Sequence, residues 1–140
     1  MGEQVADASG ALAWQAARSI NALNRLASHT EGTDQTRSFA YDPNGERIAA
    51  TDALNQSTRW TLDGLRRITA ITDAANASAT LAYNALDAVT QASDFKGVAT
   101  SYRRDAQGHA ILETSADIGS RSTRFDALGL PSQSTDALGQ

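Results

Sequence analysis

The chain contains no cysteine, which excludes disulfide bonds and zinc sites built on thiolates. It has no apolar run long enough for a membrane span, and its start carries no signal-peptide pattern. We therefore expect neither a membrane span nor a targeting signal in this chain. Its net charge of −4 also predicts no attraction to nucleic acid or to anionic membranes.

Large hydrophobic side chains are scarce. Of the 140 residues, 27 are alanine, and Leu, Ile, Val and Phe together number 24. This share lies below the level of about 20 % at which a chain struggles to build a core. Such a composition favours a thin repeat structure in which each unit is stabilised by its neighbours.

What the sequence does contain is an internal repeat of 21 residues. Steps of 21 connect the anchor positions Ile20, Tyr41, Leu62, Tyr83, Arg104 and Phe125, and an Asp or Asn follows every anchor. A hydroxyl residue lies ten positions after each anchor, at Thr30, Thr51, Thr72, Ser93, Thr114 and Thr135. An acidic residue follows in five of the six copies, and we interpret the exception, with Asp117 two residues late, as a local insertion. Agreement at this many positions establishes an internal repeat.

Each unit is predicted to be a β-hairpin. Alternating runs such as TRSFAY and STRWTL precede the anchors, and clusters of Asp, Asn and Gly punctuate the chain about every ten residues. We predict an all-β fold of antiparallel hairpins that form a curved strip. Hairpin tips are expected at 43–44, 64–65, 85–86, 106–107 and 127–128. Residues 1–17 are a lead-in, and residues 18–140 hold six repeats.

The stretch from Ala11 to Ser28 carries two interpretations. Its composition suits a helix, because it is rich in Ala, Leu and Arg. Its second half nevertheless matches a repeat, since INALNRLASHTE aligns position by position with YNALDAVTQASD. We interpret it as a degenerate first repeat and retain the helix as the alternative.

The recurring polar residues are predicted to be structural. These positions are Tyr41, Asp42, Gly45, Thr51, Asp52, Asp63, Asp73, Tyr83, Asp94, Asp105, Gly108, Phe125, Asp126, Gly129 and Asp136. A ladder of Asp residues also raises the alternative of calcium binding, but each turn offers fewer oxygen ligands than a calcium loop. Each repeat has a first turn directly after its anchor and a second turn that begins eleven residues after the anchor. In two of the six first turns Asn replaces Asp, a change that turn capping explains and metal binding does not.

No catalytic, cofactor or metal site is predicted. The two histidines, His29 and His109, lie on different repeats, and no Gly-rich phosphate loop or hydrolase motif occurs. Phe39, Trp60 and Tyr102, each two residues before an anchor, are expected to form a strip of exposed aromatics. Such a strip could bind carbohydrate or contact cargo, while cross-strand packing between hairpins is the preferred interpretation.

The motif YDPNGERIAATDALNQ, with its echoes YNALDAVTQASD and FDALGLPSQSTDALGQ, resembles the YD repeat of the Rhs family. The family includes bacterial Rhs toxins, the C components of insecticidal toxin complexes, and teneurins. The resemblance implies a non-catalytic β-shell that encloses a toxin or effector domain in a secreted or cell-surface protein. It also implies other shell repeats or the enclosed domain as partners. The alternative is a repeat module that binds carbohydrate or protein.

Six repeats are too few to enclose a protein. Twelve strands at about 4.8 Å span about 58 Å, whereas a wall around a domain of roughly 100 residues needs about 140 Å. The chain is therefore expected to be a segment of wall with free sheet edges. Because free edges and an unpartnered face favour association, we also predict that the isolated chain self-associates, either edge to edge or face to face through the Phe39/Trp60/Tyr83 side.

Overall fold

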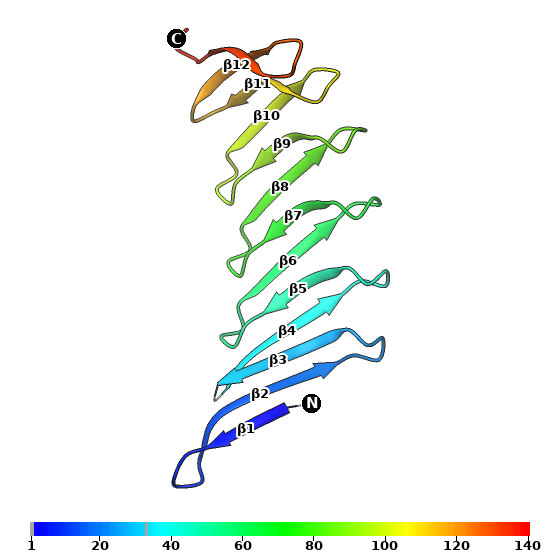
Figure 1. Cartoon of the computed structure of the whole chain (residues 1–140), viewed down its shortest axis with the longest axis vertical. Coiled ribbons are helices and arrows are strands. Elements are labelled where there is room, and N and C mark those ends of the chain that lie inside the picture. Colours follow the sequence, from blue (N-terminus) through cyan, green and yellow to red (C-terminus); the bar gives the residue numbers. More distant parts are fainter. Residues whose placement is uncertain (1, 33) are drawn as a thin grey trace. The chain divides into compact units, whose positions relative to one another are not determined.

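The computed structural model describes residues 2–32 and 34–140, which form thirteen β-strands (Figure 1). The strands are β1 (Gly2–Ala6), β2 (Leu12–Ile20), β3 (Leu26–Gly32), β4 (Gln35–Tyr41), β5 (Arg47–Thr51), β6 (Ser57–Leu62), β7 (Ile68–Thr72), β8 (Ser78–Tyr83), β9 (Val89–Ser93), β10 (Ala99–Arg104), β11 (Ala110–Ser115), β12 (Gly119–Phe125) and β13 (Pro131–Thr135). Within one sheet they follow one another in chain order. The predicted all-β fold of antiparallel hairpins is confirmed.

The N-terminal stretch is extended, so the helical alternative for Ala11 to Ser28 is wrong. Strand β2 pairs with β1 on one side and with β3 on the other, and Gln15 has a partner in each. The two ladders satisfy the backbone of β2 from both sides, and this pairing overrides the helix propensity of its alanines.

Residues 2–17, expected to be a lead-in, hold β1 and most of β2. They also hold a further turn, which begins at Asp7. The repeat pattern did not predict this turn, because β2 is nine residues long and Asp7 therefore lies outside the 21-residue register.

The five predicted hairpin tips lie where they were expected. In each, the residue before the tip accepts a hydrogen bond from the backbone N–H three positions on, as Asp42 does from Gly45 at 3.1 Å. The same residue donates its own N–H to the carbonyl four positions on, which for Asp42 is Glu46 at 2.9 Å. The turn is thus closed by two backbone bonds before any side chain contributes.

The insertion inferred near Asp117 is wrong. Strands β11 and β12 pair as far as Ser115 and Gly119, leaving three residues in the turn. In the comparable hairpin of β5 and β6, the last pair is Thr51 with Ser57, which leaves five. The repeat length is kept because a shorter turn is offset by longer strands.

No hydrophobic side chain is buried among the residues that the structure describes. Side chains alternate instead between a half-buried face and an exposed face, as in β8 and β10. The chain divides into two compact units, the first reaching Arg67 and including Thr72–Asn76, the second comprising Ile68–Ile71 and Ala77–Gln140. Each unit is therefore a single sheet layer without a core.

Candidate functional site

The repeated turn is built around one carboxylate. The Oδ1 atom of Asp52 accepts the backbone N–H groups of Leu54 and Gln56, both at 2.9 Å. The N–H of Asp52 donates to the Gln56 carbonyl at 3.0 Å, and its carbonyl accepts from Asn55 at 3.1 Å. One residue thus takes part in four hydrogen bonds of a five-residue turn, which satisfies the backbone groups that leave the ladder.

The same arrangement recurs along the chain, and Asn serves as well as Asp. Asn21 and Asn84 each accept two backbone N–H groups through Oδ1. The fourth residue of these turns has positive φ and is Gly10, Asn24, Gly45, Asn55, Arg66, Asn76, Asp87, Gly97, Gly108, Gly129 or Gly139. Gly and Asn predominate there because the left-handed region is strained for other side chains. The interchange of Asn and Asp is what turn capping requires.

The residue eleven positions after each anchor differs between copies according to the length of the second turn. Asp52, Asp94 and Asp136 each begin a five-residue turn. Glu31 and Ser115, the counterparts in two other copies, lie inside strands β3 and β11 and pair with Gln35 and Gly119. The residue at this position therefore reports turn length: Asp begins the longer turn, and another residue continues the strand.

The hydroxyl positions before the second turn pair across it. Thr51 Oγ1 lies 2.5 Å from Ser57 Oγ, and Thr30 Oγ1 lies 2.8 Å from Thr36 Oγ1. A third such pair, between Thr114 and Ser120, measures 3.2 Å. These contacts join the two strands of a hairpin on one face, which is a common form of cross-strand stabilisation.

Several of the turn carboxyls have a lowered pKa. For Asp136 the pKa is lowered mainly by the backbone N–H groups of Gln140 and Leu138. For Asp63 it is lowered by the Arg67 side chain, and for Asp7 by the Ser9 hydroxyl. Asp105 is also lowered: desolvation opposes the shift, but hydrogen bonds led by the one from His109 outweigh it. In each case the hydrogen bonds that the carboxyl group accepts stabilise its ionised form.

We predict that the chain loses stability in acid. A pKa lower in the folded than in the unfolded state stabilises the fold above the ordinary value of 3.8, and this contribution disappears as the pH falls through the folded value. The melting temperature by circular dichroism should therefore decrease between about pH 5 and about pH 3. Replacing all four residues by Asn keeps one acceptor without titration and should flatten the curve. An equally steep curve in that variant would contradict the assignment.

The anchor tyrosines join each hairpin to the preceding one. Tyr41 Oη donates to the carbonyl of Leu26 at 2.9 Å, and Tyr83 Oη donates to the carbonyl of Ile68 at 2.8 Å. Both acceptors are the first residue of the return strand in the preceding hairpin. At Leu26 the ladder register also shifts, and such a bulge leaves backbone groups without regular partners. The tyrosine supplies the missing donor.

Arg104 takes the same role as these tyrosines. Its Nε donates to the Val89 carbonyl at 2.9 Å, again the first residue of a return strand, and its Nη1 donates to the Gly108 carbonyl at 2.8 Å. Phe125, which has no donor, instead stacks on His109 with ring centroids 4.5 Å apart. The anchor position thus joins neighbouring hairpins by different chemistry in different copies.

We predict that Tyr41→Phe and Tyr83→Phe each destabilise the chain by about 1 kcal/mol, because a half-buried carbonyl loses its donor. Tyr102→Phe is the matched control, since its hydroxyl forms no hydrogen bond to any described residue. Denaturant unfolding of the three variants gives the comparison. Equal losses in all three would show that ring packing, and not the hydroxyl, matters.

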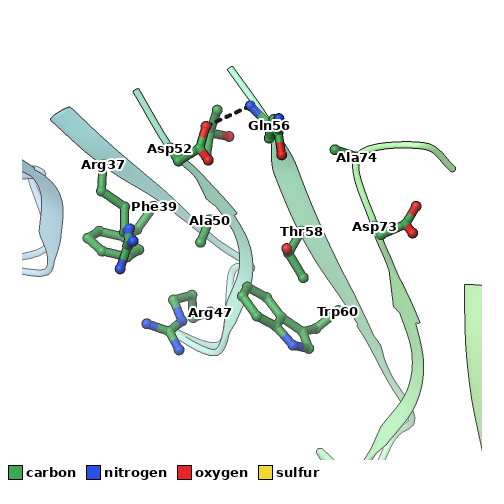
Figure 2. A pocket seen from close by; sticks show the side chains of 11 residues that line it. Arg37, Phe39, Arg47, Ala50, Asp52, Gln56, Thr58, Trp60, Asp73 and Ala74 are labelled. Carbon is green, nitrogen blue, oxygen red and sulfur yellow. Dashed lines mark hydrogen bonds between the residues drawn. The ribbon is translucent and has the colours of Figure 1, made fainter. Parts of the chain in front are cut away.

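The aromatic strip is half-buried, whereas the sequence led us to expect exposed rings. Phe39 and Trp60 lie beside Arg47, whose guanidinium carbon is 5.5 Å and 5.1 Å from their ring centroids (Figure 2). Tyr102 has Arg104 over its ring at 5.8 Å. An arginine thus covers part of every ring in the strip, which is an attractive arrangement of cation and aromatic face.

The two rings beside Arg47 line a hollow of about 430 Å³ on the first unit. Its other walls include Arg37, Ala50, Thr58, Gln56, Asp52 and Asp73 (Figure 2). The two acids belong to second turns and hold backbone N–H groups there. This hollow combines arginine and aromatic side chains on the half-buried face of β4, β5 and β6.

Each histidine pairs with an acid of its own unit. His29 Nε2 lies 3.4 Å from Glu31, and His109 Nδ1 lies 2.9 Å from Asp105. Within the described ranges, no three His, Asp or Glu side chains gather in a way that could hold a metal ion. No helix that could cross a membrane is present in the same ranges.

Sequence reasoning missed the arginines. Arg25 lies over the Tyr41 ring at 4.8 Å and donates to the Asp42 carbonyl, while Arg47 and Arg104 contact the strip as described above. The available signal was weak: Arg25, Arg67 and His109 all lie five residues after an anchor, but the other three copies have Glu46, Ala88 and Leu130 there.

Comparison with known proteins gives one family and one fold. The model of the RHS repeat matches residues 41–78. Two solved structures superpose on 99 % of this chain with a TM-score of 0.70: a Photorhabdus luminescens Tc holotoxin pore at 14 % identity, and a TcdB2-TccC3-Cdc42 crystal structure at 15 % identity. A TcdB2-TccC3-TEV crystal structure superposes on 98 % with a TM-score of 0.67 at 12 % identity. No curated protein matches the sequence.

The chain spans 9 % of the length of each of these solved chains, so the likeness concerns one stretch of their fold. The matched residues 41–78 hold two anchors and four capped turns, which begin at Asp42, Asp52, Asp63 and Asp73. The same turns recur on both sides of that segment, from Asn21 to Asp136. The chain therefore carries a match to the RHS repeat at residues 41–78, and its fold is similar to one stretch of these solved chains.

Proposed function

We propose that this chain is a non-catalytic segment of an Rhs/YD-type shell, which in a larger secreted or cell-surface protein encloses a toxin or effector domain. The carrying observation is that the recurring residues serve the sheet itself. The carboxylates cap turns, the hydroxyls pair across strands, and the anchors bind the preceding hairpin. A single layer in which no described hydrophobic side chain is buried has the form of a wall, whereas a catalytic domain needs a packed core to hold its groups in place.

The alternative proposal is a repeat module that binds carbohydrate or protein. The hollow beside Phe39 and Trp60 supports a binding role in general. For sugar, the geometry is less favourable, because Arg47 lies over both rings and a sugar needs an open ring face on which to stack. Binding of a neutral oligosaccharide that disappears in Trp60→Ala would favour this alternative.

Protease protection tests the enclosing role. The polypeptide encoded by the complete reading frame is compared with a variant in which Asp42, Asp52 and Asp63 are replaced by Ala, which weakens three adjacent turns. We expect the segments outside the repeats to resist protease in the parent and to be cleaved much faster in the variant. A matched variant with Asn at the same positions should retain protection, since Asn caps the same turn at position 21.

Two outcomes contradict the enclosing role. One is a reading frame that encodes no domain beyond shell repeats. The other is an equal rate of cleavage outside the repeats in the parent and in the Ala variant.

A further inference from the structure

Arg37 and Arg47, on the half-buried face of the first unit, form neither a hydrogen bond nor an ion pair with any described residue. Arg25 binds the Asp42 carbonyl, Arg66 pairs with Glu46 at 3.2 Å, and Arg67 pairs with Asp63 at 2.7 Å. By contrast, neither Arg37 nor Arg47 forms an ion pair with any residue in the described part of the chain. Both are exposed, and both line the hollow.

The acids beside these arginines are already occupied. Asp52 Oδ1 accepts two backbone N–H groups, and Asp73 Oδ1 accepts the N–H of Ala75 at 2.9 Å. Their hydrogen bonds hold them at the turns, at the rim of the hollow (Figure 2). The hollow therefore presents two guanidinium groups that pair with no acidic side chain among the described residues of this unit.

The rings decide which anion fits. The guanidinium carbon of Arg47 lies over the rings of Phe39 and Trp60, while its N–H groups donate to no described residue and so remain for an acceptor. A carboxylate fits such an edge with two parallel hydrogen bonds. Ala50 and the indole of Trp60 provide apolar surface beside it. Arginine and tryptophan are also the side chains most enriched in energetically dominant protein contacts.

We propose that Arg37, Arg47, Phe39 and Trp60 form a docking site for an extended peptide that carries carboxylates next to apolar side chains. The inference extends the proposed function, since a wall segment needs a polypeptide that contacts it, and it assigns the contact to this hollow. Charge complementarity selects the acidic peptide, and the covered ring faces disfavour a sugar.

Tryptophan fluorescence tests the site in the full chain. Trp14→Phe leaves Trp60 as the only indole, and the probe is a blocked peptide of alternating Glu and Leu. A matched peptide of Gln and Leu controls for apolar binding. We expect saturable binding of the acidic peptide only, weaker at higher salt because the charges are exposed.

Three substitutions then locate the contact. Arg47→Gln should weaken binding by about tenfold or more, and Arg37→Gln, which leaves the rings and Arg47 in place, by several-fold. Arg59→Gln is the control, because Arg59 alternates with Trp60 on β6 and faces the opposite side. It should change binding by less than about twofold. Circular dichroism verifies that each variant is folded.

The site is refuted if both peptides bind alike, if neither binds, or if Arg59→Gln weakens binding as much as Arg47→Gln. It is also refuted if a uronic acid oligosaccharide binds more tightly than the acidic peptide. None of these results affects the protease test of the enclosing role, so the two proposals fail independently.

Discussion

Replacing Arg104 by Met should destabilise the chain by about 2–4 kcal/mol, more than the loss of either anchor tyrosine hydroxyl. The guanidinium donates to the carbonyls of Val89 and Gly108 at 2.9 and 2.8 Å. Hydrogen bonds to a charged donor contribute about 1.5–3 kcal/mol each, and both acceptors lose their partner together. Met retains the length and apolar character of the side chain, so the loss measures the two donors together with the contact of the guanidinium over the Tyr102 ring.

The rescue variant is Arg104→Tyr. Tyrosine at the corresponding positions 41 and 83 donates to the first residue of the preceding return strand, as Arg104 does to Val89. Arg104→Tyr should therefore recover part of the lost stability, with the Gly108 carbonyl left to solvent. Denaturant unfolding of the three proteins gives the comparison. If Met and Tyr are equally destabilising, the carbonyl of Val89 does not need a donor from the anchor.

The position of the hairpins could be predicted because turn chemistry is local. An Asp or Asn caps its own turn through atoms two and four residues away, so its spacing in the sequence is its spacing in the fold. The tips at 43–44 and 127–128 follow from that spacing alone. The error at Asp117 has the same origin, because a late Asp was interpreted as an insertion when the strands themselves had lengthened.

Contacts between hairpins were harder to predict, because they join positions 15 or more residues apart through unlike side chains. Tyr41 and Arg104 both donate a hydrogen bond to the first carbonyl of the preceding return strand, although a phenol and a guanidinium have no evident chemical similarity in the sequence. The 21-residue spacing identified Arg104 as an anchor, but it did not predict the contact that its side chain makes. The hollow beside Arg47 was missed because it depends on which side chains lie over which rings.

The missing core has a physical consequence. The chain exposes 9748 Å² of surface, whereas a compact protein of 14.7 kDa exposes about 6,900 Å². Strands β1 and β13 end the sheet, and each pairs with a neighbour on one side only. At the β1 end, Val5 pairs with Trp14 in register, and these two and Leu12 are 40–48 % exposed. An unpaired edge beside an apolar patch is a surface on which another strand can add.

We therefore predict that the isolated chain self-associates, most simply as a two-fold dimer that pairs the β1 edges and covers Val5, Leu12 and Trp14. The sequence suggested the Phe39/Trp60/Tyr83 side as one route, but Arg47 and the Tyr83 hydrogen bond already engage that side, so the β1 edge is the better surface. Size exclusion with light scattering at high micromolar concentration should give about 29 kDa, twice the 14.7 kDa of one chain.

Val5→Lys combined with Trp14→Lys should return the chain to a monomer, because each association would bury two pairs of like charges beside a pairing edge. Leu54→Lys is the matched control: this leucine is 77 % exposed at a turn tip, where no strand edge is free, and its replacement should leave the mass unchanged. A folded 14.7 kDa monomer for the parent chain would show that its edges are protected. Dissociation by Leu54→Lys alone would instead place the contact at the turn tips.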